Sequence, residues 1–168
     1  AKGGVRAVTI ARLCAELGVT KGRFYHHFRN VEDFRRQLLT HWSSERERQV
    51  SVAAAAVADP IQRLEVLRDF AVGLHHEAEA AIRAWSRTDP EAWAVREKVD
   101  TARERTITQA YVDAGLPADE AELMGRAAVA VLIGAQHRGH ATDRALLDAM
   151  FRRLHPLAMG AGRVELPC

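Results

Sequence analysis

Five side chains near the start of the chain could together bind a polyanion. They are two basic residues, Lys21 and Arg23, and three residues with polar rings, Tyr25, His26 and His27. Lysine and arginine neutralise phosphates or bond to guanine edges. Tyrosine and histidine combine an apolar ring with a hydrogen-bonding tip, which suits phosphate or base contacts. These residue types favour contact with DNA, and a solvated amphipathic helix that happens to be basic is the alternative.

Two short helices must position these side chains. Residues 10–17 carry apolar residues at the 3-4-7 spacing of one helical face. Thr9 is a candidate N-cap for that helix, and Gly18 suits the left-handed residue at its C-terminus. Thr20 is a second candidate N-cap, which predicts a helix over 21–27. Two short helices joined by a glycine-containing turn form a helix-turn-helix.

The second helix has an inner and an outer face. Phe24 and Phe28 are four residues apart and should point inward together. Lys21, Arg23 and the three polar rings then cover the rest of the circumference, and Gly22 adds no bulk where a groove wall would come close.

Charge is distributed unevenly along the chain. Residues 1–48 hold ten Lys and Arg against five Asp and Glu, a net charge of +5, whereas the rest of the chain carries −3. A basic N-terminal part on an acidic body favours a polyanion-binding head, although uneven charge is common in proteins of other kinds.

The stretches Val8–Ala11 and Gly18–Asn30 resemble the DNA-binding signature of the tetracycline-repressor (TetR) family, and GVTKGRFYHHF is its most specific part. The resemblance implies that Thr9 and Thr20 cap helices and bond phosphates. It also implies which residues face the major groove or its backbone, namely Lys21, Gly22, Arg23, Tyr25, His26 and His27.

The chain departs from the family pattern in two places. The family commonly has Lys where this chain has Val31, so one phosphate contact is missing or is supplied by Arg29 or Arg35. The family also has a helix before the helix-turn-helix. Residues 1–6 are too few to form it, so we expect that helix to be missing or truncated.

The remaining sequence predicts an all-α body. One long helix is expected over 31–57, and Asp59-Pro60 and Asp89-Pro90 are start signals for two more. Further helices are expected from about residue 118 and from Asp143. We expect a DNA-binding domain over 1–48 and an effector-binding and dimerisation domain over 49–168.

Apolar residues on two sides of the helix from 118 predict packing partners on both sides. The family resemblance implies that the last two helices pair with their symmetry mates, so we predict a C2 homodimer, with filling of these faces within one chain as the alternative. The predicted interface residues are Ala121, Met124, Gly125, Ala128, Leu132, Leu147, Met150, Phe151 and Leu154.

The middle of the body could hold a small effector, as the resemblance implies. Aromatic side chains would line the site and a few polar groups would bond the ligand. The candidates are Phe70, His75, Trp85, Trp93 and Tyr111. The two tryptophans are equally well explained as ordinary core or interface residues.

Catalytic and metal chemistry have little support in the sequence. There is no Glu-x-x-His pair and no Gly-x-Ser-x-Gly motif, and Cys14 fits a small buried hydrophobe. His26 and His27 would point about 100° apart on a helix, and His137 with His140 fits solvated histidines at a helix end better than a zinc site. We therefore expect no enzyme activity, no cofactor and no metal.

No apolar run is long enough to cross a bilayer, and a cytoplasmic protein is expected. The sequence predicts a ligand-responsive transcriptional regulator that binds a palindromic operator as a homodimer and is released by a small effector. Repression is expected, although no residue distinguishes it from activation. The alternative is a helical homodimeric interaction module that does not bind DNA.

Overall fold

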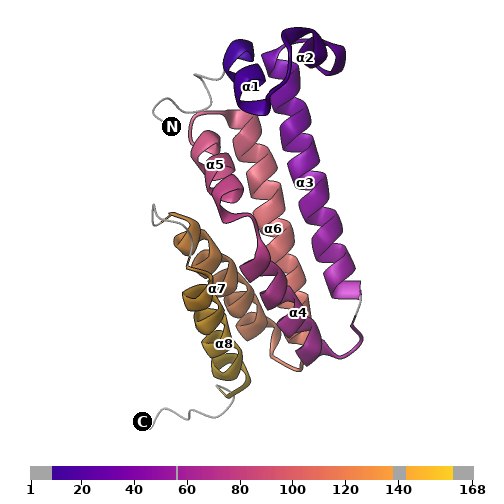
Figure 1. The fold of residues 1–168 in the computed structure, drawn as a ribbon. Coiled ribbons are helices and arrows are strands. Elements are labelled where there is room, and N and C mark those ends of the chain that lie inside the picture. Colours follow the sequence, from indigo (N-terminus) through magenta and orange to yellow (C-terminus); the bar gives the residue numbers. More distant parts are fainter. Residues whose placement is uncertain (1–8, 56, 138–142, 161–168) are drawn as a thin grey trace.

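The computed structural model describes residues 9–55, 57–137 and 143–160, and all regular structure in those ranges is helical (Figure 1). This confirms the predicted all-α fold with an N-terminal helix-turn-helix. Residues 1–6, where the truncated helix was expected, lie outside the described ranges. The helices are α1 Ile10–Leu17, α2 Lys21–His27, α3 Val31–Ala55, α4 Pro60–Gly73, α5 His76–Ser86, α6 Pro90–Asp113, α7 Ala118–His137 and α8 Arg144–Gly160.

Both Asp-Pro signals start helices, as predicted. The Asp59 carboxylate accepts from the backbone N–H of Ile61 at 2.8 Å, and Asp89 accepts from Glu91 and Ala92 at 3.0 Å. In each case the proline occupies the first turn, where no N–H is needed.

No separate helix was predicted between residues 74 and 89, but the structure has α5 there. The residue before α5 is His75, and its side chain makes no capping bond. The start of α5 therefore lacks the local signal that marks α4 and α6, and its formation depends on the side chains that it buries against α6 and α7.

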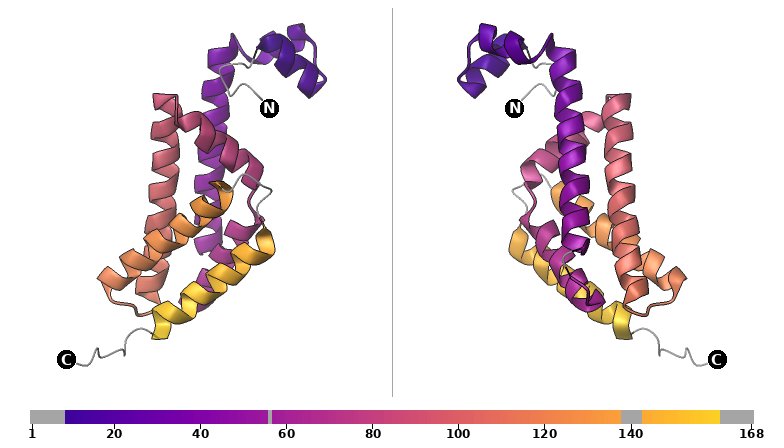
Figure 2. Two further views of the ribbon diagram at one scale, coloured as in Figure 1. Left: turned by 90° about the vertical axis from the view of Figure 1, so that its left-hand side faces the viewer. Right: turned by 90° about the vertical axis from the view of Figure 1, so that its right-hand side faces the viewer.

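The head formed by α1 and α2 lies at one end of α3 and projects away from the body (Figure 2). Helix α3 continues without a break through residue 48, so the expected domain boundary falls inside a helix. Its later turns lie beside α6 in the body (Figure 1). The head is thus attached to the body by a continuous rod.

Three apolar clusters form the core of the body. Leu39 and Trp42 of α3 pack with Trp85 of α5 and Val99 of α6. A second cluster surrounds Tyr111, and a third lies between α4, α7 and α8. None of the helices in the described ranges combines the length and hydropathy needed to cross a membrane.

A network of buried charges joins α3, α5 and α6. Glu79 of α5 is 1% exposed and accepts from Trp42 Nε1 at 3.0 Å and from Arg103 Nη2 at 2.8 Å. Arg83 of α5 donates to both carboxylate oxygens of Asp100 at 2.6 and 2.7 Å. Buried charges need such partners because leaving water is costly. The network therefore sets how α3, α5 and α6 lie against one another.

Helices α6 and α7 approach closely where α7 has a glycine. A Cβ at Gly125 would overlap Oγ1 of Thr108 and lie 3.1 Å from the carbonyl oxygen of Glu104. Gly134, in the same helix, has open space at the corresponding position.

We predict that Gly125→Ala lowers the free energy of unfolding by about 1–3 kcal/mol, because the added methyl group must push α6 and α7 apart. Gly134→Ala is the matched control and should raise that free energy by about 0.5–1 kcal/mol through helix propensity. Urea denaturation followed by circular dichroism measures both. Equal effects of the two substitutions would contradict the close packing at Gly125.

Candidate nucleic-acid interface and ligand cavity

An aromatic cluster holds α2 against α3. Phe24 is almost completely buried, and its ring centroid lies 5.1 Å from that of Phe28 and 5.9 Å from that of Phe34. Phe28 and Phe34 meet edge to face at 5.0 Å. Phe24 and Phe28 therefore lie on the face of α2 that packs against α3, as their spacing predicted.

Local capping sets the ends of both head helices. Thr9 Oγ1 accepts from the backbone N–H of Arg12 at 3.3 Å, and Thr20 Oγ1 accepts from that of Arg23 at 3.2 Å. Gly18 has φ 62°, the left-handed conformation that ends α1 and that a side chain would disfavour. These caps determine where the turn falls and hence which residues begin α2.

All the residues predicted to contact DNA are exposed in the structure. They are Thr9, Thr20, Lys21, Gly22, Arg23, Tyr25, His26, His27 and Arg29. Tyr25 is 54% exposed although it is aromatic. An exposed tyrosine between cations and histidines gives α2 a surface that can donate hydrogen bonds to phosphates and base edges.

The corner between α2 and α3 is held by Asp33, which the sequence analysis did not single out. Asp33 Oδ2 accepts from the backbone N–H of Arg29 at 2.9 Å, and its carboxylate also accepts from the Arg29 guanidinium. Asn30 Oδ1 accepts in return from the Asp33 N–H at 2.8 Å. The signal that could have found this corner is the Asn-x-x-Asp spacing, which resembles a capping box.

These contacts change the acidity of Asp33. The hydrogen bonds from the Arg29 backbone and side chain favour the carboxylate and lower the pKa of Asp33 to about 2. The Arg29 side chain is still 81% exposed, so this cation stays available to a phosphate. Arg35, the other candidate to replace the missing lysine, is half-buried.

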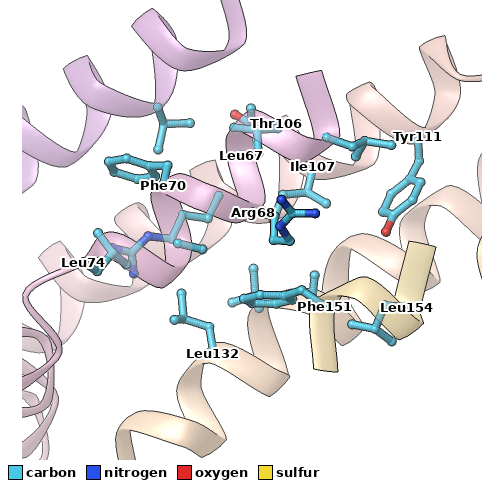
Figure 3. Close-up of a pocket in the computed structure, with 16 residues that line it drawn as sticks. Leu67, Arg68, Phe70, Leu74, Thr106, Ile107, Tyr111, Leu132, Phe151 and Leu154 are labelled. Atoms are coloured by element: carbon cyan, nitrogen blue, oxygen red, sulfur yellow. The ribbon is translucent and has the colours of Figure 1, made fainter. Parts of the chain in front are cut away.

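A mostly apolar cavity of about 60 Å³ lies between α4, α6, α7 and α8, and Val50 of α3 also contributes to its wall. Phe70 and Ile107 lie across it from Leu132 and Phe151, and Tyr111 stands at one end (Figure 3). Burial raises the pKa of Tyr111 to about 12, so its hydroxyl stays protonated.

Two of the five predicted ligand residues, Phe70 and Tyr111, line this cavity, and the other three do not. His75 is exposed, Trp93 is 53% exposed on α6, and Trp85 is buried in the cluster with Trp42. The aromatic character of these residues could not indicate which way each points. Arg68 and Arg103 also line the cavity, and neither was among the residues predicted from the sequence.

Most residues predicted for the dimer interface are covered within one chain. Six are buried by α4, α6 or each other, namely Ala121, Gly125, Ala128, Leu132, Leu147 and Phe151. Met124 and Leu154 are half-buried, and Met150 is 40% exposed. The inward-facing apolar side of α7 is therefore covered by helices of the same chain, which was the alternative to a dimer interface there. The outer side is different, because Leu123 of α7 and Leu146 of α8 are exposed apolar residues.

The described ranges contain no group of three or more His, Cys, Asp and Glu side chains placed to hold a metal ion. His26 and His27 lie with ring centroids 5.0 Å apart and planes at 79°. The prediction of solvated histidines at His137 and His140 falls partly outside those ranges, because His140 is not described; His137 is exposed.

An exposed basic helix in a helix-turn-helix head, attached to an all-helical body, defines a DNA-binding transcriptional regulator. The family model described as "Bacterial regulatory proteins, tetR family" matches residues 1–38. The N-terminal part of the chain is therefore a DNA-binding domain of the tetR family type, as the resemblance implied. No curated protein matches it.

We predict that the stability of the protein depends on pH through Asp33. A lowered pKa stabilises the fold above the ordinary value of 3.8, and this contribution is lost as the pH falls toward about 2. Wild type should therefore lose more stability over this window than Asp33→Asn.

Melting temperatures followed by circular dichroism between these pH values measure the difference. The matched control is Glu32→Gln, which removes the exposed carboxylate next to Asp33 in the same helical turn. Identical pH profiles for wild type and Asp33→Asn would contradict the role of Asp33 at the corner.

Proposed function

We propose that this protein is a ligand-responsive repressor that binds a palindromic operator as a homodimer and is released by a small effector. The observation that carries the proposal is the exposed set of cations and polar rings on α2, at the tip of a head that projects from the body. Its partner in the cell is double-stranded DNA, so we place its action in the cytoplasm.

Two heads are needed because one short helix reads few base pairs. A symmetric dimer places two recognition helices on half-sites about 34–36 Å apart, or a multiple of that distance, and so requires a palindrome. The spacing of the heads then controls affinity for DNA.

We place the dimer interface on the outer side of α7 and α8, which lie together on one face of the body (Figure 2). Leu123 is 62% exposed on α7, and Leu146 and Met150 follow one another at i,i+4 on α8. Exposed apolar residues of this size on adjacent helices favour burial by a second copy.

The effector site is proposed for the cavity beside α4, α6, α7 and α8. A ligand can release DNA only if it binds the released state more tightly than the DNA-bound one. Glu79 offers a physical connection, because it joins α6 to α3, the helix that bears the head.

We predict that the triple variant Lys21→Ala/Arg23→Ala/Tyr25→Ala binds DNA at least about tenfold more weakly than wild type. The salt dependence should also fall, by about 0.9 in the slope of log K against log salt for each phosphate that the variant no longer neutralises. The measurement is a titration of the full-length protein against fragments flanking its own coding region, at two salt concentrations.

The double variant Lys98→Ala/Arg105→Ala is the matched control, because it removes two exposed cations from α6 in the body. It should bind like wild type. If wild type and the triple variant bound every fragment equally poorly, the DNA proposal would fail and the interaction module without DNA binding would replace it.

We predict that Leu123→Glu/Met150→Glu converts the dimer to a monomer, since four carboxylates would then face one another across the two-fold axis. Sedimentation velocity gives the mass directly. Val52→Glu, a substitution at an exposed apolar residue on α3, is the control and should leave the dimer intact. A double variant that stays dimeric would place the interface elsewhere.

A further inference from the structure

The cavity has two cations in its wall, and their charges are balanced differently. Arg68 lies within ion-pair distance of three carboxylates, those of Glu65, Asp69 and Asp148. Its charge is therefore fully matched within the chain. Arg103 instead shares its two carboxylate partners, Glu79 and Asp100, with other arginines.

The network around Arg103 contains more positive than negative charge. Arg46 Nε lies 3.2 Å from Glu79, and Arg83 is bonded to Asp100. Arg96 also approaches Asp100, but it has the more exposed Glu97 as a second partner at 3.0 Å. Glu45 also attracts Arg46, but it has Arg48 as its own ion-pair partner. Arg46, Arg83 and Arg103 are then left to share the two carboxylates of Glu79 and Asp100.

One excess positive charge thus lies in a buried region. Burial alone would raise the pKa of Asp100, but hydrogen bonds and attraction from Arg83, Arg103 and Arg96 outweigh it and hold that pKa below its ordinary value. Asp100 is therefore ionised and counts as a negative charge in this network.

Arg103 is also incompletely bonded. Its side chain is 5% exposed, and its Nε has no hydrogen-bond acceptor among the described residues. A buried donor without a partner costs about 1–3 kcal/mol. The same residue lines the apolar cavity, so a ligand that enters the cavity can reach the network at Arg103.

We infer that the cavity binds an apolar molecule that ends in one anionic group, such as a carboxylate, and that Arg103 is the residue that binds this group. The apolar part would lie between Phe70 and Phe151. The anion would neutralise the excess charge and give Arg103 an acceptor, and a neutral or cationic ligand could do neither.

Binding must widen the cavity. An apolar cavity of about 150 Å³ holds benzene, whereas this one measures about 60 Å³. A ligand of that size or larger therefore has to move α4 or α8 away from α6, and the energy of binding is linked to a change in helix packing.

The anion would also compete with Glu79 for Arg103. Glu79 accepts from Trp42 of α3 and pairs with Arg46 of α3, so a change in its bond to Arg103 alters how α3 is held. This part of the inference rests on the proposed function, in which the position of α3 sets the spacing of the heads.

The test compares three ligands with the same apolar chain, octanoate, 1-octanol and octylammonium, by isothermal titration calorimetry without DNA. Wild type should bind octanoate with a Kd at or below about 1 mM and at least about tenfold more tightly than the other two. Arg103→Gln should lose this preference. Arg96→Gln removes the same charge from the same network but does not line the cavity, and it should keep the preference.

Removal of Arg103 alone leaves Glu79 with fewer partners and could unfold the protein. The double variant Glu79→Gln/Arg103→Gln removes the pair together and should also lose the preference. Equal binding of octanoate and 1-octanol by wild type, no binding of octanoate, or a preference that survives in the double variant would each overturn the inference.

Because the calorimetry contains no DNA, its outcome is independent of operator binding. A DNA titration with and without octanoate then tests the regulatory part, and octanoate should weaken DNA binding by wild type. Failure of all DNA binding, with the octanoate preference intact, would contradict the proposed function and leave the assignment of the cavity standing.

Discussion

The burial of the Glu79 carboxylate is the constraint on which the arrangement of the body depends. A buried carboxylate has to be paired, because removing one partner of such a pair costs about 3–5 kcal/mol. The partners of Glu79 come from two other helices, Trp42 and Arg46 from α3 and Arg103 from α6. Helix α3 therefore cannot slide along the body without breaking hydrogen bonds that water does not replace.

This constraint connects the two ends of the molecule. Helix α3 continues from the body into the head, where Asp33 and an aromatic cluster hold α2. The direction in which α2 projects thus follows from the way α3 is anchored at Glu79. The cavity meets this network at Arg103 and meets α3 itself at Val50, so both lie in contact with the rod that carries the head.

Much of the head was predictable because its signals are local. Thr9, Thr20 and Gly18 act within a few residues of themselves, and Phe24 and Phe28 share a face by helical spacing alone. The two Asp-Pro starts are local in the same sense. Helix α5 was missed because His75 makes no cap and its helical face is defined by burial against other helices. The Asp33 corner was missed although its Asn-x-x-Asp spacing is visible in the sequence.

The sequence by itself determined the helix-turn-helix, the exposed basic face of α2, the all-α body and the likeness of residues 1–38 to the tetR family. Capping and periodicity depend on neighbours along the chain, so these features are visible without the tertiary structure. Only the tertiary structure decided which side of α7 faces the body, where Trp85 and Trp93 point, and that Arg103 rather than His75 lines the cavity. Those outcomes depend on contacts between helices far apart in sequence. A helix with apolar residues on two sides carries no local information about which side its own chain will cover.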